Sequence, residues 1–341
     1  MTEQFFSTHP NLSRKEFVAK ALEEIGADQA LEALRQMYLI RHLETRGEAA
    51  YQHGKIGGFY HAYSGQEAIQ VAAVQAIGVD NWWTTTYRCH ALALLLGESP
   101  DAIMAELYGK VTGVAKGRGG SMHLYAKTML GGFGIVGGHL PIATGAAFSA
   151  KYLKEKRISV CFLGDGAVAQ GAFHESLNLA ALWELPVLFV IENNQWGMGT
   201  HVQRAIAFDR MAESQAPSYG IKGYTLNGMD YFGCYTAFKE IAKEVHQNKP
   251  VLVECICERF KGHSISDPGL YRSKSELEEA QKKDPILLLS QVLKDAKIVT
   301  DAEIAEIDHQ AKAVVMEALK FADESKEPSL ATLEEGVYAP D

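Results

Sequence analysis

Hydrophobic and polar positions between residues 158 and 199 follow a strand, helix, strand pattern. Two runs of large apolar residues, Ile158–Leu163 and Pro186–Ile191, enclose the stretch Ala169–Trp183. That stretch places apolar residues on one helical face, at Phe173, Leu177, Ala180 and Ala181. A unit of this size predicts two parallel strands joined by a right-handed crossover. Asp165 and Asn194 follow the two strands, so we expect both at the carboxyl edge of the sheet, where open α/β sheets bind ligands.

Similar patterns elsewhere extend this unit into a larger α/β fold. Further strands are predicted at Trp82–Thr86, Ile221–Leu226 and Val251–Cys257. Helices are predicted at Asp28–Gln52, Gln66–Ile77, 139–153, Tyr235–His246, from Asp284 to about Leu293, and after a capping box that begins at Thr300. We therefore expect a mostly parallel central sheet with helices on both faces. One domain should span residues 28–325, between a partly ordered arm (1–27) and a tail (326–341).

The helix that starts at Thr300 carries a long apolar stripe, formed by Ile304, Ile307, Ala311, Val314, Ala318 and Phe321. A stripe of this kind indicates a face buried against other elements. The simplest interpretation is that the helices after residue 284 cover the sheet. A contact with another subunit is the alternative.

The connecting segments are rich in glycine and polar residues. Gly54–Gly65 is expected to form a loop that exposes His61. Residues 113–145 hold ten of the 31 glycines, which indicates either close approach of a ligand or tight helix packing. Gln195–Ala216 is loop-like, and Arg259–Arg272 has no apolar periodicity. We expect the latter to be a mobile surface loop of the kind that often carries function.

The loop after the first strand suggests a specific chemistry. Gly164-Asp165-Gly166 precedes a helix, and a helix N-terminus favours an anion such as diphosphate. A bare carboxylate would repel that anion unless a hard cation lay between them. Mg²⁺ or Ca²⁺ accepts an Asp carboxylate and an Asn carbonyl as ligands, so Asp165 and Asn194 predict a metal-bridged diphosphate site. Two alternatives are a dinucleotide turn and an N-cap role for Asp165.

Composition narrows the class of protein. The chain has 341 residues, 47% hydrophobic and 22% charged, which is typical of a soluble globular protein. A net charge of −9 argues against a nucleic-acid partner. Its five cysteines lack metal-type spacing, which favours reduced thiols. There is no 18-residue apolar run to predict a membrane helix. The first residues resemble neither a secretion signal nor a transit peptide, so we expect a cytoplasmic protein.

Several segments together resemble one known family. GDG, 26 further residues and NN resemble the thiamine diphosphate motif. GDGAVAQG, ALWELPVLFVIENNQWGMGT and RFKGHSISDPG are similar to the alpha subunits of thiamine-diphosphate-dependent pyruvate dehydrogenases, within the 2-oxo acid dehydrogenase family. The resemblance runs from roughly Asp28 to Asp323. It implies the thiamine-diphosphate-binding fold.

The resemblance also implies a role for individual residues. Mg²⁺ would be held by Asp165, Asn194 and the backbone carbonyl of Trp196. The diphosphate would be held by Tyr87, Arg88, Gly166, Ala167 and His263. The backbone of Gly134 and Val136 would bind the aminopyrimidine ring of thiamine diphosphate. His61 and His263 would act in proton transfer or transition-state stabilisation, because an ordinary histidine titrates near neutrality.

Without the resemblance, simpler interpretations of these residues hold. Arg88 would be a surface ion-pair partner, His90 a helix cap and His263 a solvent-exposed histidine. Even with it, ligand and structural roles for His90 stay equally open. Ser264 matches a serine that is phosphorylated in some relatives. However, DPGLYR is one residue shorter than the family's pattern and lacks its second serine, so phosphorylation control is not predicted.

The implied activity is oxidative decarboxylation of pyruvate, with acetyl transfer to a lipoyl group on an acyltransferase partner. In the family, a glutamate that contacts the aminopyrimidine comes from the beta subunit. No second α/β module is recognisable here, so we expect a shared active site in an α2β2 assembly. Alternatives are a branched-chain 2-oxo acid or acetoin dehydrogenase alpha subunit, a non-catalytic binding subunit and a nicotinamide dehydrogenase. NNQWGMGT followed by VQRA favours pyruvate.

Overall fold

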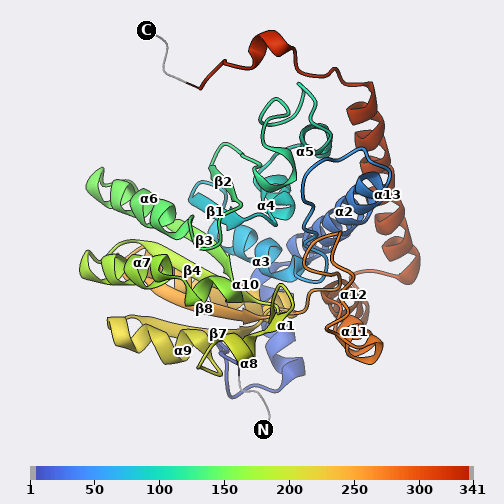
Figure 1. The fold of residues 1–341 in the computed structure, drawn as a ribbon. Helices are drawn as coiled ribbons and strands as arrows, with labels where there is room; N and C mark the ends of the chain where they lie inside the picture. The colour runs from blue at the N-terminus through green and yellow to red at the C-terminus, as the bar shows by residue number, and fades with distance from the viewer. Residues whose placement is uncertain (1–4, 338–341) are drawn as a thin grey trace.

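A parallel six-stranded sheet forms the centre of the protein (Figure 1). The computed structural model describes residues 5–337. The strand order is β2-β1-β3-β4-β8-β7, and all five neighbouring pairs are parallel. The strands are β1 (Trp82–Thr86), β2 (Met129–Phe133), β3 (Ser159–Gly164), β4 (Val187–Asn193), β7 (Lys222–Asn227) and β8 (Val251–Ile256). A two-stranded antiparallel ribbon, β5 (Trp196–Gly197) and β6 (Thr200–His201), follows β4. The predicted α/β class and mostly parallel sheet are confirmed.

Helices cover both faces of this sheet because its strands are apolar on both sides. Alternate residues of β3 enter different cores: Val160 and Phe162 enter one, Cys161 and Leu163 the other. On the Cys161 side pack α6 (Leu140–Tyr152), α7 (Gly171–Leu182) and α9 (Met211–Gln215). The opposite core includes α1 (Arg14–Ile25), α2 (Ala27–Gln52), α3 (Glu67–Ile77), α4 (His90–Leu95), α5 (Pro100–Leu107), α10 (Tyr231–Val245), α12 (Pro285–Asp295) and α13 (Asp301–Glu324). Two further helices, α8 (Val202–Ala205) and α11 (Lys274–Gln281), lie in the connections.

The N-terminal arm contains a helix that the sequence analysis did not predict. Ser13 and Glu16 form a capping box at the start of α1. Phe17, Ala21 and Ile25 are buried, and the helix contacts α2 and α10. These three residues are spaced by four, so the sequence already carried the helical signal.

The position of α13 also corrects a prediction. Its capping box at Thr300 and Glu303 is present, but the helix packs on α2 and α5 rather than on the sheet. Val314 and Phe321 of the expected stripe are 46% and 39% exposed, respectively. Val315 and Ala322 are buried in their place, because over several turns the contact line shifts around the helix.

Charged contacts fix the start of α3. The Arg41 guanidinium of α2 donates to Glu67 at 2.6 Å and to Asp284, before α12, at 2.7 Å. Glu67 is fully buried and is the first residue of α3. These contacts hold the N-terminal end of α3 beside the carboxyl edge of the sheet. None of the helices within residues 5–337 is both long and apolar enough to cross a membrane.

Candidate active site

A cavity of about 980 Å³ opens at the carboxyl edge of the sheet, beyond β1, β3 and β4. The structure brings every predicted site residue to its wall: His61, Tyr87, Arg88, Gly134, Val136, Asp165, Gly166, Ala167, Asn194, Trp196 and His263. They come from segments as far apart in the sequence as His61 and His263. The parallel topology explains this convergence, because each strand delivers its following loop to the same edge.

Asp165 follows β3 and is buried, with 3% of its surface exposed. Burial raises the pKa of its carboxyl to about 6, although the charges of Arg259 and Arg88 act in the opposite direction. A cation bound beside Asp165 would favour the ionised form.

Asp165 begins a short 3₁₀ turn, and α7 begins only at Gly171. The N-cap alternative is wrong, because Gly164 and Gln170 occupy the two capping positions.

The two asparagines at the end of β4 have different surroundings. Asn193 donates to Glu254 of β8 at 2.7 Å and accepts from the Gln195 backbone at 3.0 Å. Asn194 lines the cavity instead. Its Nδ2 donates to Gln66 Oε1 at 2.9 Å, which leaves Oδ1 with a 3.3 Å contact to the Trp196 backbone nitrogen. Asn194 is therefore the member of the pair whose amide oxygen a metal could use.

Arg88 is 4% exposed and has no carboxylate within 4.0 Å among the described residues. Its guanidinium donates to the backbone carbonyls of Ala62 at 2.7 Å and His263 at 2.6 Å. Burial lowers its pKa to about 10. The surface ion-pair interpretation is therefore wrong. A buried cation without an acidic partner is costly, and an anion in the cavity would offset that cost.

Two histidines lie against Arg88 and Tyr87. The His61 ring centroid is 4.4 Å from that of Tyr87 and 5.0 Å from that of His263. Burial, reinforced by the Arg88 charge, lowers the pKa of His61 to about 3 and that of His263 to about 4. Within the described chain, neither Nδ1 has a hydrogen-bond partner. Both histidines are thus neutral at pH 7, with a ring nitrogen free for a ligand.

The surroundings of both histidines correct two expectations. The loop before α3 does not expose His61, which is only 6% exposed. His263 is partly buried rather than solvent-exposed. Asp267 stabilises the loop that carries His263. Its carboxylate accepts hydrogen bonds from the His263 backbone N–H at 2.6 Å and from the Tyr271 hydroxyl at 2.6 Å.

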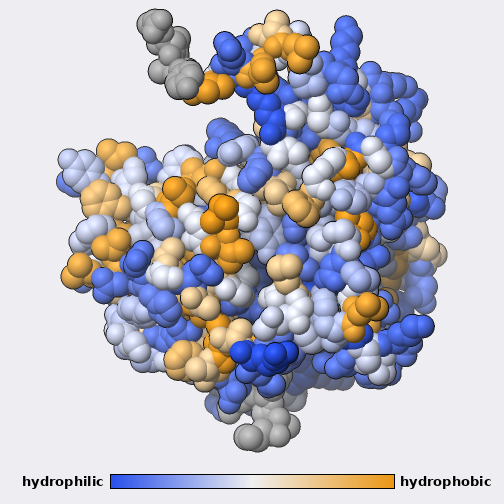
Figure 2. Space-filling model, in the orientation of Figure 1, coloured by the Kyte–Doolittle hydropathy of each residue, from blue (hydrophilic) through white to orange (hydrophobic). Residues whose placement is uncertain are grey.

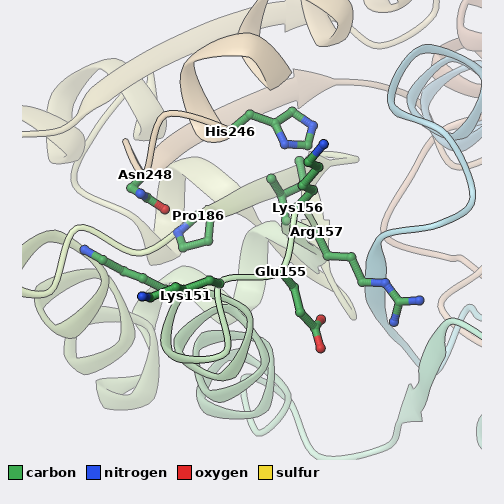
Figure 3. A pocket seen from close by; sticks show the side chains of 9 residues that line it. Lys151, Glu155, Lys156, Arg157, Pro186, His246 and Asn248 are labelled. Carbon is green, nitrogen blue, oxygen red and sulfur yellow. The ribbon is translucent and has the colours of Figure 1, made fainter.

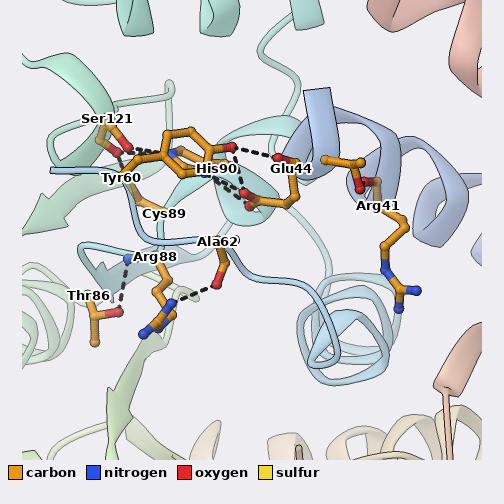
Figure 4. A network of polar contacts seen from close by, with 10 residues as sticks. Arg41, Glu44, Tyr60, Ala62, Thr86, Arg88, Cys89, His90 and Ser121 are labelled. Carbon is orange, nitrogen blue, oxygen red and sulfur yellow. Dashed lines mark hydrogen bonds and ion pairs between the residues drawn. The ribbon is translucent and has the colours of Figure 1, made fainter. Parts of the chain in front are cut away.

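His90, whose role the sequence left open, lies in a separate buried network (Figure 4). Its Nδ1 is 3.0 Å from the Glu44 carboxylate and its Nε2 is 2.8 Å from Ser121 Oγ. The Tyr60 hydroxyl donates to the same carboxylate at 2.8 Å. His90 is not a helix cap, since Cys89 holds that position in α4. It does not line the cavity either.

Arg259 is a site residue that sequence reasoning missed. Its side chain is buried and donates to the carbonyls of Trp196 at 3.1 Å and Met198 at 3.3 Å. It also donates to the Tyr271 hydroxyl at 2.7 Å. The Trp196 carbonyl has a second lone pair for another partner. The RFKGHS motif shows that this arginine lies four residues before His263. It does not reveal the contacts of the side chain, because most of its partners are distant in the sequence.

A second cavity, of about 540 Å³, lies at the opposite edge, before β3 and β4 (Figure 3). It is lined mainly by cationic and polar side chains: Lys151, Lys154, Lys156, Arg157, His246 and Asn248, together with Glu155. Most of these side chains are exposed. None of the predicted site residues lines it, so the cavity at the carboxyl edge is the candidate active site.

Comparison with known proteins agrees with this geometry. Residues 35–331 match the dehydrogenase E1 component family. The chain is 42% identical over 315 residues to the pyruvate dehydrogenase E1 component subunit alpha of Rickettsia felis, a match that covers 91% of this chain and 96% of the relative. The corresponding protein of Rhizobium meliloti is 38% identical over 94% of this chain and 93% of its own length. The chloroplastic subunit alpha-3 of Arabidopsis thaliana is 39% identical over 92% of this chain and 76% of its own length. The chain belongs to the dehydrogenase E1 component family.

Proposed function

We propose that this chain is the alpha subunit of a thiamine diphosphate- and Mg²⁺-dependent pyruvate dehydrogenase. One observation carries the proposal: Arg88, a buried cation without an acidic partner among the described residues, and Asp165, a buried carboxylate, line the same cavity. A metal-bound diphosphate would compensate both charges, because its oxygens attract Arg88 while its cation attracts Asp165.

The residues around the cavity fit these groups. Asp165, Asn194 and the Trp196 carbonyl would supply oxygen ligands to Mg²⁺. Tyr87, Arg88, His263 and the turn at Gly166 and Ala167 would hold the diphosphate. Gly166 leaves room for it, since the nearest atom to an added Cβ would be Gly197 Cα at 3.7 Å. The backbone of Gly134 and Val136 would bind the aminopyrimidine.

Thiamine diphosphate, when bound, supplies the carbon nucleophile and electron sink for decarboxylation of a 2-oxo acid. The chain's own residues supply position and proton transfer. His61 and His263 are neutral at working pH in the cofactor-free chain, and the negative charge of a bound diphosphate would raise their lowered pKa values. Each would then be able to accept a proton at its free Nδ1. Arg88 would hold negative charge in a region with little water, where electrostatic attraction is stronger.

The open side of the cavity supports a partner subunit. Ile135 and Val136, which line it, are 78% and 45% exposed. The adjacent helix α6 presents Ile142, Phe148 and Tyr152 to solvent, and hydrophobic side chains gather over α6 and α7 in Figure 2. We infer that a beta subunit covers this face in an α2β2 assembly. The assembly would pass its acyl group to a lipoyl-bearing acyltransferase.

The carboxylates of the cavity also support a shared site. Within the described residues, the acids that line it are Asp165, Glu192 and Asp267. Glu192 accepts hydrogen bonds from Tyr63 and Gln70, and Asp267 from its own loop. None is therefore left to contact the aminopyrimidine, and the glutamate that contacts this ring in the family would come from the beta subunit.

The proposal that the substrate is pyruvate rests on the names of the relatives, and it can be tested directly. The proteins compared above are all pyruvate dehydrogenase alpha subunits. The chain, co-produced with the beta subunit from the neighbouring gene, should turn over pyruvate faster than 2-oxoisovalerate or acetoin, and only with thiamine diphosphate and Mg²⁺. The chain alone should be inactive. Full activity of the lone chain would contradict the shared site, and a preference for another substrate would contradict the pyruvate assignment.

We also propose that the protein works in the cytoplasm. All five cysteines are free and buried, as is usual in a reducing compartment. Cell fractionation with antibody detection tests this location, and recovery outside the cytoplasmic fraction would contradict it.

A further inference from the structure

Two glutamines at the start of α3 contact two residues at the end of β4. Gln66 immediately precedes α3, and Gln70 lies about one turn later, so both face the same side. Glu192 and Asn194 are two residues apart at the end of β4 and also share a side. Gln66 Oε1 accepts from Asn194 Nδ2 at 2.9 Å, and Gln70 Nε2 donates to Glu192 at 3.2 Å. All four side chains are buried.

The distance between the two glutamines along the helix matches the distance between their two partners along the strand. Four helical residues rise about 6 Å, and two strand residues span about 6.6 Å. Gln66 and Gln70 can therefore contact Asn194 and Glu192 together without distortion of either element. The ion pairs of Arg41 with Glu67 and Asp284 hold the start of α3 in place for these contacts.

The contact determines which atom of Asn194 faces the metal site. An amide offers an oxygen on one side and a nitrogen on the other, and Mg²⁺ binds oxygen. In the structure Gln66 presents Oε1, which can only accept, and Asn194 Nδ2 accordingly points to α3. Asn194 Oδ1 is then on the side available to a cation.

One further feature distinguishes Gln66 from an ordinary buried residue. Its Nε2 has no hydrogen-bond partner among the described residues, although the side chain is only 1% exposed and Gln66 lines the cavity. Gln70 Oε1, in the neighbouring contact, is also without a partner among the described residues, but Gln70 does not line the cavity, whereas Gln66 does. A buried donor left unsatisfied is destabilising, as it is for the two cavity histidines.

We infer that Gln66 is a positioning residue for the metal site, which fixes the Asn194 amide with its oxygen toward the cation. This inference rests on the proposed Mg²⁺-diphosphate site and deepens it. Loss of a residue that orients a metal ligand typically weakens metal binding about 10- to 100-fold. Such loss need not change the stability of the cofactor-free protein.

The test uses the assembled enzyme and measures the Kd for Mg²⁺ at saturating thiamine diphosphate, from the intrinsic tryptophan fluorescence. Gln66→Met removes the acceptor and should raise this Kd at least about tenfold. Gln66→Glu keeps an oxygen acceptor at the same length and should leave the Kd at or below the wild-type value. Gln75→Met is the matched control on α3, because Gln75 contacts Gln36 and Tyr231 and does not line the cavity.

The outcomes separate this inference from the proposed function. A wild-type Mg²⁺ Kd in Gln66→Met, or an equal loss in Gln66→Met and Gln66→Glu, would overturn the positioning role. The unfolding midpoint of the cofactor-free protein is measured in parallel. A fall in Gln66→Met beyond that in Gln75→Met, with an unchanged Mg²⁺ Kd, would assign Gln66 to the fold alone. If Asp165→Asn keeps normal Mg²⁺ affinity, the metal site itself is wrong.

Discussion

Two buried polar regions draw on neighbouring residues of the sequence but differ in their bonding. The paired network, formed by Glu44, Tyr60, His90 and Ser121, joins each ring nitrogen of His90 to a partner. The cavity groups, His61, Arg88 and His263, are different. Both histidines have an Nδ1 without a partner within residues 5–337, and Arg88 has no acidic neighbour. Arg88 and His90 are only two residues apart.

This difference separates groups that stabilise the fold from groups that bind. A buried polar group with partners contributes to stability, whereas one without partners is destabilising by about 1–3 kcal/mol. The cavity groups therefore lower the stability of the cofactor-free protein. A bound anion would offset this loss of stability by interacting with them. The comparison predicts that substitutions in the two regions have opposite effects on stability and activity.

The largest effect is expected from Asp165→Asn, which removes the buried charge with little change in shape. A metal contributes several kcal/mol to such sites, so kcat/KM for pyruvate should fall about 1000-fold, or about 4 kcal/mol. The unfolding midpoint of the cofactor-free chain should not fall, because burial disfavours the ionised form of Asp165. Steady-state kinetics of the assembled enzyme and thermal unfolding measure the two quantities. Normal cofactor retention and activity would favour a non-catalytic binding subunit.

Glu44→Ala should have the largest effect on stability. It leaves His90 and Tyr60 without their shared partner, in a region with no exposed surface at Glu44. The free energy of unfolding should fall by about 3 kcal/mol, as measured by urea denaturation. Glu175→Ala on the exposed side of α7 is the control and should change little. A Glu44→Ala protein as stable as the wild type would contradict the structural role of the paired network.

His61→Gln should act mainly on catalysis. A positioned acid–base group contributes about 100-fold or more, so kcat for pyruvate should fall by about two orders of magnitude. Stability should stay the same or rise, since the substitution removes a buried ring nitrogen that has no partner within residues 5–337. Kinetics and unfolding of the same preparation distinguish this from the Glu44→Ala behaviour. Wild-type kcat would exclude His61 from proton transfer.

The smallest effect is a change in the pH dependence of stability. The pKa of His61 falls from its ordinary 6.5 to about 3 in the folded chain. Between these values the unfolded chain binds a proton that the folded chain does not, so stability is lost as pH falls below about 6.5. Unfolding midpoints of the cofactor-free protein at pH 4.5 to 7.5 should therefore show a flatter acid decline in His61→Gln. An unchanged decline would contradict the burial of this histidine.

Local patterns were sufficient to predict five of the six sheet strands and to place Asp165 and Asn194 at one edge, while the family resemblance supplied most of the other site residues. The strand β2 was missed, because its short Met129–Phe133 run contains two glycines and lies in the glycine-rich region. Apolar runs identified β3 and β4, and their parallel direction brought Asp165 and Asn194 together. The burial of His61 was missed, because it depends on the distant Tyr87 and His263. Gln66 and Arg259 were missed for the same reason, since their partners are 128 and 63 residues away. Only the fold determines such contacts.

The most direct test compares cofactor binding with stability in two variants of the assembled enzyme. Thiamine diphosphate is titrated at fixed Mg²⁺ into wild type, Asp165→Asn and Glu44→Ala, and the unfolding midpoint of each cofactor-free protein is recorded. We predict that Asp165→Asn loses cofactor affinity without loss of stability. Glu44→Ala should lose stability and, below its unfolding midpoint, bind the cofactor with wild-type affinity. Cofactor binding that survives in Asp165→Asn but fails in folded Glu44→Ala would contradict the assignment of the two regions.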